Sequence, residues 1–138
     1  MNSFFDTLEN RAPADREADL LQALPGQVAH ARSRSAAFAE ILADVHPAHI
    51  TSRAALARLP VTRKHELLER QQAQRNQNAF GGFATIGFGA QMPRVFASPG
   101  PIYEPEGTRA DYWRTGRAMY AAGFRAGELA HNAFSYHM

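Results

Sequence analysis

The sequence contains no cysteine, a single lysine and no long apolar run. Without cysteine the chain can form neither a disulfide framework, nor a thiolate nucleophile, nor a cysteine-ligated zinc site. No apolar stretch approaches the ~20 residues that a membrane-spanning helix needs, so we expect no membrane partner. The first residues, Met1 to Phe5, lack the basic start and long apolar core of a signal peptide. These absences favour a cytoplasmic protein.

An excess of charge of one sign is also absent, since 15 basic residues face 13 acidic ones and the formal net charge is +2. Such a balance creates no large field, so we predict no nucleic-acid partner. One segment, from Arg53 to Arg75, is locally basic. A solvated helical face is the simpler interpretation of it, and nucleic-acid binding through this helical segment is a further alternative. With 138 residues, 45% of them hydrophobic, we expect one domain or part of one.

Residues 1–78 are predicted to form a helical N-terminal segment. Apolar residues recur at helical spacing up to Leu24. Pro25 fits the first turn of a further helix, so we expect a boundary between two helices there. The periodicity resumes after Ser35 and breaks at residues 44–51.

Two short helices are expected after this break. Thr51 or Ser52 is the predicted cap of the first, which Pro60 ends, and Thr62 is the predicted cap of the second. Helices this short are stable only when they pack against something else.

Residues 79–138 have a different sequence pattern, which begins with glycine interleaved with aromatic residues. We predict a buried strand at residues 95–97 and a short second strand at residues 102–103, joined by a turn. A helix should start at Thr108, where Asp111 completes a capping box, and should end at Gly123. Leu129 to Phe134 is predicted to be a further strand. The expected fold class is therefore α/β.

The segment from Ser98 to Gly107 is the clearest candidate for a binding loop. Glycine permits close backbone approach, so successive amides there could cradle a phosphate. Three prolines remove amide donors, however, and Glu104 and Glu106 would repel an anion. On these residues alone, a rigid structural turn is favoured. The glycine spacing around Ser98 does not match a nucleophile elbow, so we predict no catalytic serine.

No metal site is predicted. His46 and His49 are two residues apart, but Pro47 separates them, and neither cysteine nor a nearby pair of carboxylates completes a ligand set. At the end of the chain, Phe134, Tyr136 and His137 would lie at the carboxyl edge of a sheet, where α/β folds bind ligands. Packing in a core accounts for the aromatic residues equally well.

Several segments resemble the N-terminal part of phenylacetate–coenzyme A ligases, a family of AMP-forming adenylating enzymes. The resemblance covers nearly all of the chain and about the first third of such an enzyme. It rests on four stretches in the same order: Leu59 to Leu67, Phe80 to Phe83, Arg94 to Gly107, and Asp111 to Leu129. Residues 79–138 would then be the start of the sheet subdomain of an incomplete large domain.

The resemblance implies a function and a set of site residues. The family forms an acyl-adenylate from a carboxylic acid and ATP with magnesium, and then transfers the acyl group to coenzyme A. Its phosphate loop, Ser-Ser-Gly-Thr-Thr-Gly-Lys-Pro, aligns with Ser98 to Pro105, so Ser98, Gly100, Tyr103 and Glu104 become candidates for a degenerate phosphate loop. Glu104 replaces the lysine. Phe134, Tyr136 and His137 are similar to an aromatic motif beside the acyl pocket.

We therefore expect an N-terminal fragment of a phenylacetate–coenzyme A ligase-like enzyme. The later adenine-site, ribose-site and lysine motifs have no counterpart here, so the 138-residue chain itself should be inactive and should hold no cofactor tightly. The alternative is a non-catalytic interaction module, a homo-oligomer that pairs through an exposed sheet edge at Leu129 to Phe134.

Overall fold

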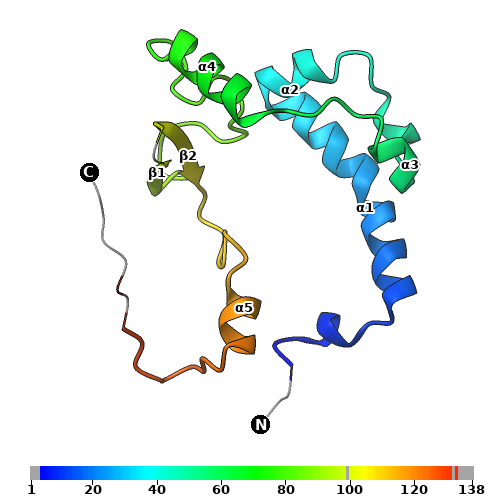
Figure 1. Cartoon of the computed structure of the whole chain (residues 1–138), viewed down its shortest axis with the longest axis vertical. Helices are drawn as coiled ribbons and strands as arrows, with labels where there is room; N and C mark the ends of the chain where they lie inside the picture. The colour runs from blue at the N-terminus through cyan, green and yellow to red at the C-terminus, as the bar shows by residue number, and fades with distance from the viewer. Residues whose placement is uncertain (1–3, 99, 132, 134–138) are drawn as a thin grey trace.

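The computed structural model describes residues 4–98, 100–131 and 133. Within these residues the chain is mixed α/β, with five α-helices and one two-stranded antiparallel sheet, so the coarse fold class is confirmed. Two short 3-10 turns complete the set (Figure 1). In chain order the elements are η1 (Thr7–Asn10), α1 (Pro13–Arg34), α2 (Ala36–Ile41), η2 (Pro47–His49), α3 (Arg53–Leu56), α4 (Lys64–Gln74), β1 (Arg94–Ser98), β2 (Ile102–Glu106) and α5 (Gly116–Ala121).

Helix α1 is continuous through Pro25, so the predicted boundary between two helices is wrong. Proline removes one hydrogen bond of the helix ladder, which an isolated helix tolerates poorly. Here the residues on either side of it are held by packing, because Val28 is buried and Leu24 packs against the same core. Tertiary contacts therefore keep the helix in one piece.

The caps of the short helices follow local signals. The Ser35 hydroxyl accepts from the Phe38 N–H at 3.2 Å and begins α2. Of the two predicted caps for α3, the structure uses Ser52, which accepts from the Ala55 N–H at 3.1 Å. Helix α4 begins one residue later than predicted, because the Glu66 carboxylate accepts from the backbone N–H of Arg63 at 2.8 Å.

The main apolar core is small and lies where α1, α2, η2 and α3 meet. Its buried members come from successive elements and are Val28, Leu42, Ile50 and Ala55. Five partly buried residues pack around them, namely Leu24, Phe38, Ile41, Val45 and Leu59. None of the large apolar side chains in the described part of the chain is completely buried.

A glycine pair links this helical core to the second half of the chain. Gly81 and Gly82 have φ values of 60° and 80°, where side chains are disfavoured. A Cβ atom on Gly81 would lie 3.0 Å from the Gln71 backbone nitrogen, and one on Gly82 would lie 3.2 Å from the Ala37 nitrogen. The Gly82 carbonyl accepts from both the Ser35 hydroxyl at 2.8 Å and the Ala37 N–H at 3.1 Å. Positions 81 and 82 therefore favour glycine, because the loop passes close to the backbone of α2 and α4.

Beyond the hairpin, the helix starts at Gly116 and not at Thr108 as predicted. Asp111 and Arg114 have φ values of 49° and 56°, outside the helical region. The Asp111 carboxylate accepts from the Gly116 N–H at 3.0 Å, so it caps α5 instead of closing a box with Thr108. The predicted stop at Gly123 is confirmed, since Phe124 N–H bonds to Met119 C=O and Gly123 N–H bonds to Tyr120 C=O in a Schellman motif.

The predicted strand at Leu129 to Phe134 is wrong for the residues that the structure describes there, because 129–131 and 133 are not extended in a sheet. Leu129 is fully exposed. A strand needs a neighbouring strand to satisfy its backbone, and none of the described segments pairs with these residues. The edge on which the interaction-module alternative relied is therefore not formed by these residues.

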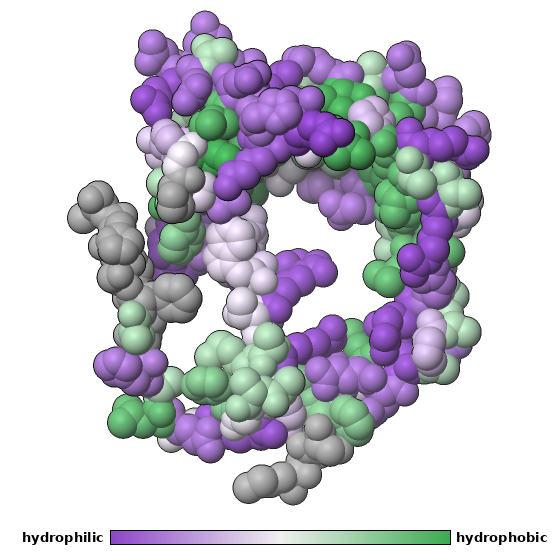
Figure 2. Space-filling model, viewed as in Figure 1, coloured by the Kyte–Doolittle hydropathy of each residue, from purple (hydrophilic) through white to green (hydrophobic). Residues whose placement is uncertain are grey.

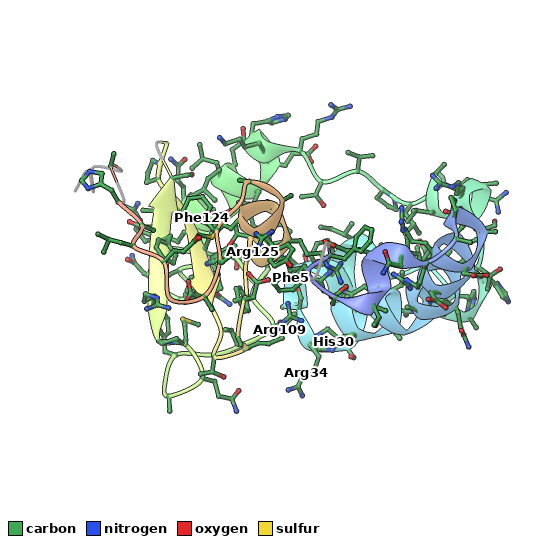
Figure 3. All side chains as sticks on the ribbon, turned by 90° about the horizontal axis from the view of Figure 1, so that it is seen from below. Phe5, His30, Arg34, Arg109, Phe124 and Arg125 are labelled. Atoms are coloured by element: carbon green, nitrogen blue, oxygen red, sulfur yellow. The ribbon has the colours of Figure 1, made fainter. Side chains whose placement is uncertain are left out.

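The elements are arranged as a ring (Figure 1), and Figure 2 shows an opening through its middle. The ring closes where η1 meets α5, because Phe5 stacks edge-on against Tyr120 with ring centroids 5.8 Å apart and Arg117 pairs with Asp6 at 2.5 Å. Arg125 also lies over the Tyr120 ring, at 3.6 Å from its centroid. Figure 3 labels Arg125 and Phe5, the two side chains that contact Tyr120. Two distant parts of the sequence are thus held together.

The ring exposes much surface for its mass. The accessible surface is 10731 Å², whereas a compact monomer of 15.2 kDa is expected to expose about 7,100 Å². Thirteen large apolar side chains among the described residues are exposed, including Phe88, Val61 and Leu20. None of the helices within the described ranges is long and apolar enough to cross a bilayer.

Candidate functional site

The β1–β2 hairpin occupies the stretch where the sequence predicts a degenerate phosphate loop. Ser98 ends β1 and Gly100 lies in the turn with a φ of 103°. Tyr103 and Glu104 lie in β2, which extends to Glu106, so the loop is shorter than the predicted Ser98 to Gly107. The structure thus places Ser98 at the end of β1, Gly100 in the turn, and Tyr103 and Glu104 on β2.

Strand β1 was predicted to be buried, and this is wrong, because its residues 94–97 are exposed and only Ser98 is partly covered. An apolar sequence such as Val-Phe-Ala is typical of a buried strand, but burial also requires a neighbour. Only β2 pairs with β1 within the described part of the chain. Val95 and Phe96 therefore keep 42% and 39% of their surface exposed.

The register determines which backbone groups of the hairpin point outward. Val95 lies opposite Pro105 and Ala97 opposite Tyr103. Proline has no N–H, so the Val95–Pro105 pair cannot exchange two hydrogen bonds, and by alternation the Ala97–Tyr103 pair does not either. The N–H and C=O groups of Val95, Ala97 and Tyr103 consequently point away from the partner strand.

The outward groups of Tyr103 are both bound by one side chain of α4. The Gln71 carboxamide accepts from the Tyr103 N–H at 2.8 Å and donates to the Tyr103 C=O at 3.0 Å. Gln71 is buried, with 4% of its surface exposed, so both bonds are protected from water. Sequence reasoning missed this residue, although its position four residues after Leu67 places both on one face of the helix.

A cleft of about 270 Å³ lies beside this contact. Its walls are largely apolar and come from α4, the loop after the glycine pair, β2 and the segment before α5. The lining includes Leu67, Phe80, Phe83, Ile86, Ile102 and Trp113. Tyr103 and Glu104 also line it, and the Glu104 carboxylate is exposed. The apolar walls of the cleft suit an apolar group. A phosphate does not suit it, because the Glu104 carboxylate would repel the phosphate.

Glu106 connects the hairpin to the segment before α5. Its carboxylate accepts from the Arg94 Nε at 2.9 Å and from the Trp113 Nε1 at 2.6 Å. The Arg94 guanidinium and then the Trp113 indole N–H hold the pKa of Glu106 below its usual value. Phe96 packs edge-on against Trp113 with centroids 5.9 Å apart. The negative charge of Glu106 is therefore compensated locally, and its role is to join elements.

The acyl-pocket candidates Phe134, Tyr136 and His137 lie outside the described residues. No group of three or more histidine, aspartate or glutamate side chains within the described ranges could hold a metal ion. The His46 and His49 rings contact each other in a tilted arrangement, with centroids 5.4 Å apart. They form a local contact on the 3-10 turn.

The locally basic segment is partly neutralised by acidic residues of other helices. Arg53 forms two hydrogen bonds with Glu17, at 2.5 and 2.7 Å. Arg70 binds Glu40 at 2.8 and 2.9 Å and also donates to the Gly81 C=O at 2.7 Å. These two arginines therefore link α1 with α3 and α2 with α4.

Comparison with protein-family models, with curated proteins and with solved structures gave no match.

Proposed function

We propose that this chain forms the N-terminal part of an acyl-activating enzyme similar to phenylacetate–coenzyme A ligases. The reaction of that enzyme would convert a carboxylic acid, ATP and coenzyme A to an acyl-coenzyme A through an acyl-adenylate. The observation that supports the proposal most directly is the hairpin. A strand ending in Ser98, a turn containing Gly100 and a second strand stand where the resemblance puts the phosphate loop.

The large exposed surface also supports the proposal. An accessible surface of 10731 Å² exceeds that of a compact protein of this mass by about 3,600 Å². The exposed side chains include the large apolar residues Phe88, Trp113 and Met119. An enzyme whose remaining segments pack on this layer would cover such side chains.

The described residues do not fit a magnesium–nucleotide complex by themselves. Between Ser98 and Ile102 only Gly100 carries a backbone N–H, because residues 99 and 101 are prolines. The exposed carboxylate of Glu104 adds a like charge near the place where phosphate would lie. We therefore propose that the 138-residue chain is inactive and that no step of the reaction is carried by it alone.

The experiment is acid-dependent release of pyrophosphate. The 138-residue chain and the protein encoded by the whole reading frame are each incubated with ATP, magnesium and a panel of aryl and alkyl carboxylic acids. We expect release from the longer protein with at least one acid and none from the chain alone. Absence of release with every acid would refute the proposal, and so would release by the 138-residue chain. Samples without acid are the control.

A further inference from the structure

The hairpin has one covered edge and one bare edge. On β2 the outward groups of Tyr103 are bound by Gln71, and Pro105 has no N–H to offer. On β1 the outward N–H and C=O groups belong to Val95 and Ala97. No described residue outside the hairpin bonds to them. A row of unpaired groups of this kind is a template for another strand.

The centre of the bare edge carries none of the features that prevent pairing. Its centre is Val95, Phe96 and Ala97, all exposed and uncharged. The charge at one end, on Arg94, is compensated by the buried carboxylate of Glu106. The strand contains neither lysine nor proline. Native proteins usually place such residues on edges that must stay single.

We propose that this edge binds β1 of a second copy of the chain in the antiparallel direction, with a two-fold axis between the two Phe96 residues. In that register Val95 of each copy faces Ala97 of the other, and the two pairs exchange four backbone hydrogen bonds. Phe96 faces Phe96 of the second copy as the closer, non-hydrogen-bonded pair, which favours aromatic contact. The product is a four-stranded sheet in the order β2–β1–β1–β2.

Self-pairing is favoured because the outward groups are symmetric about Phe96. It also ends at two copies, because each hairpin has a single bare edge and isologous pairing consumes it. Pairing would also cover exposed apolar side chains, since Val95 and Phe96 keep 42% and 39% of their surface accessible. The net charge of +2 opposes association only weakly.

The test measures association by sedimentation velocity between about 1 and 100 μM. We expect the unaltered chain to dimerise as the concentration rises. In the V95K/A97K variant like charges face each other in both pairs, which should raise the dissociation constant by about tenfold. In V95K/A97E each lysine faces a glutamate, so the dissociation constant should return to within about threefold of the original value.

Two controls accompany these variants. V61K places a lysine at a more exposed valine outside the hairpin, since Val61 keeps 75% of its surface accessible and Val95 42%, and it should leave the dissociation constant unchanged. Circular dichroism of all variants must be the same at low concentration, which shows that the monomer is folded. A monomer at every concentration would overturn the inference, as would equal weakening of both double variants, which indicates another register.

Protection of the Val95 and Ala97 amides only in the longer protein would assign the edge to a different segment and would also overturn the inference. The proposed dimer does not depend on the proposed acyl-activating function. A chain that dimerises in this register, from a reading frame whose product releases no pyrophosphate, would retain this inference and lose the proposed function.

Discussion

At the scale of single residues, Gln71 replaces a neighbouring strand. Its carboxamide supplies one donor and one acceptor to the backbone of Tyr103, with distances of 3.0 and 2.8 Å. A primary amide is well suited among side chains to this geometry, since it carries both groups on one planar unit. One residue thereby closes an edge of the sheet and fixes α4 against β2.

Replacement of Gln71 by alanine should leave both outward groups of Tyr103 without a protein partner. We expect a loss of about 1–3 kcal/mol in the free energy of unfolding and faster hydrogen exchange at the Tyr103 amide, measured by NMR. Gln72→Ala is the matched control, because Gln72 is the next residue of the same helix and is exposed. Equal exchange rates at Tyr103 in the two variants would contradict this role.

We expect the stabilisation by Glu106 to depend on pH, with a sign that follows from its lowered pKa. The bonds from Arg94 and Trp113 favour the charged form, so their stabilisation is present above the ordinary value of 4.5 and is lost as the pH falls through the lower folded value. We expect the fluorescence of Trp113, the single tryptophan, to change in this acidic range. Glu106→Gln should remove the transition because the amide does not ionise.

Glu104→Gln is the control for this titration, since Glu104 lies on the same strand and is exposed. It should leave the transition in place. Asp6, Glu17 and Glu40 also have lowered pKa values, each chiefly through a hydrogen bond from an arginine. Far-UV circular dichroism measures the helix content separately, so effects of these three carboxylates on the helices can be distinguished from the Trp113 transition. A Trp113 transition that persists unchanged in Glu106→Gln would refute the assignment.

At the scale of elements, the glycine pair determines how the helical core meets the hairpin. Gly81 and Gly82 pass between α2 and α4, and their carbonyl groups are bound by Arg70 and Ser35. The backbone approaches the two helices too closely for side chains. The two halves of the chain are therefore connected by a contact that depends on the absence of a Cβ atom.

Gly81→Ala should destabilise this connection. With a φ of 60° and a Cβ position 3.0 Å from the Gln71 nitrogen, we expect a cost of about 1–3 kcal/mol in urea unfolding. Gly26→Ala is the contrasting variant, because Gly26 lies within α1 and a Cβ there meets nothing within 4 Å. It should stabilise the chain by about 0.5–1 kcal/mol. Similar midpoints for both variants would contradict the account.

The sequence predicts elements well where the signal is local and fails where a distant neighbour decides. The cap at Ser52, the hairpin and the stop at Gly123 follow from a few adjacent residues. The continuity of α1 through Pro25 depends on the packing of Val28, and the late start of α5 accompanies the bond between Trp113 and Glu106. Neither contact can be inferred from a few adjacent residues of the sequence.

The same distinction applies to the candidate site. The positions of Ser98 and Gly100 at a turn could be predicted, since glycine and proline mark it. The exposure of β1 could not, because an apolar strand does not specify what covers it. The contact of Gln71 with Tyr103 joins residues 32 positions apart, and a helical pattern indicates only that Gln71 faces inward.

At the scale of the whole molecule, a small core supports an extended ring. The buried apolar residues in the described part of the chain are few, and four of the eight are not members of the main cluster: Ala37, Phe80, Met92 and Ile102. A protein that buries so little apolar surface has a small margin of stability. The ring is therefore expected to gain stability from whatever packs on it.

Small-angle scattering measures the ring directly. A compact chain of 138 residues has a radius of gyration of about 14 Å, and we expect a clearly larger value for the monomer. The V95K/A97K variant is the appropriate sample, at a concentration where sedimentation velocity shows it to be monomeric. A value near that of a compact protein would show that the ring collapses in solution.

The contact that closes the ring has a consequence for the order of folding. Asp6 and Arg117 lie 111 positions apart, so bringing them together confines most of the polypeptide, and the entropy of that confinement grows with the length of the loop. The helices and the hairpin need only short loops and can form in microseconds. The contact between η1 and α5 should then form last during folding and be lost first during unfolding.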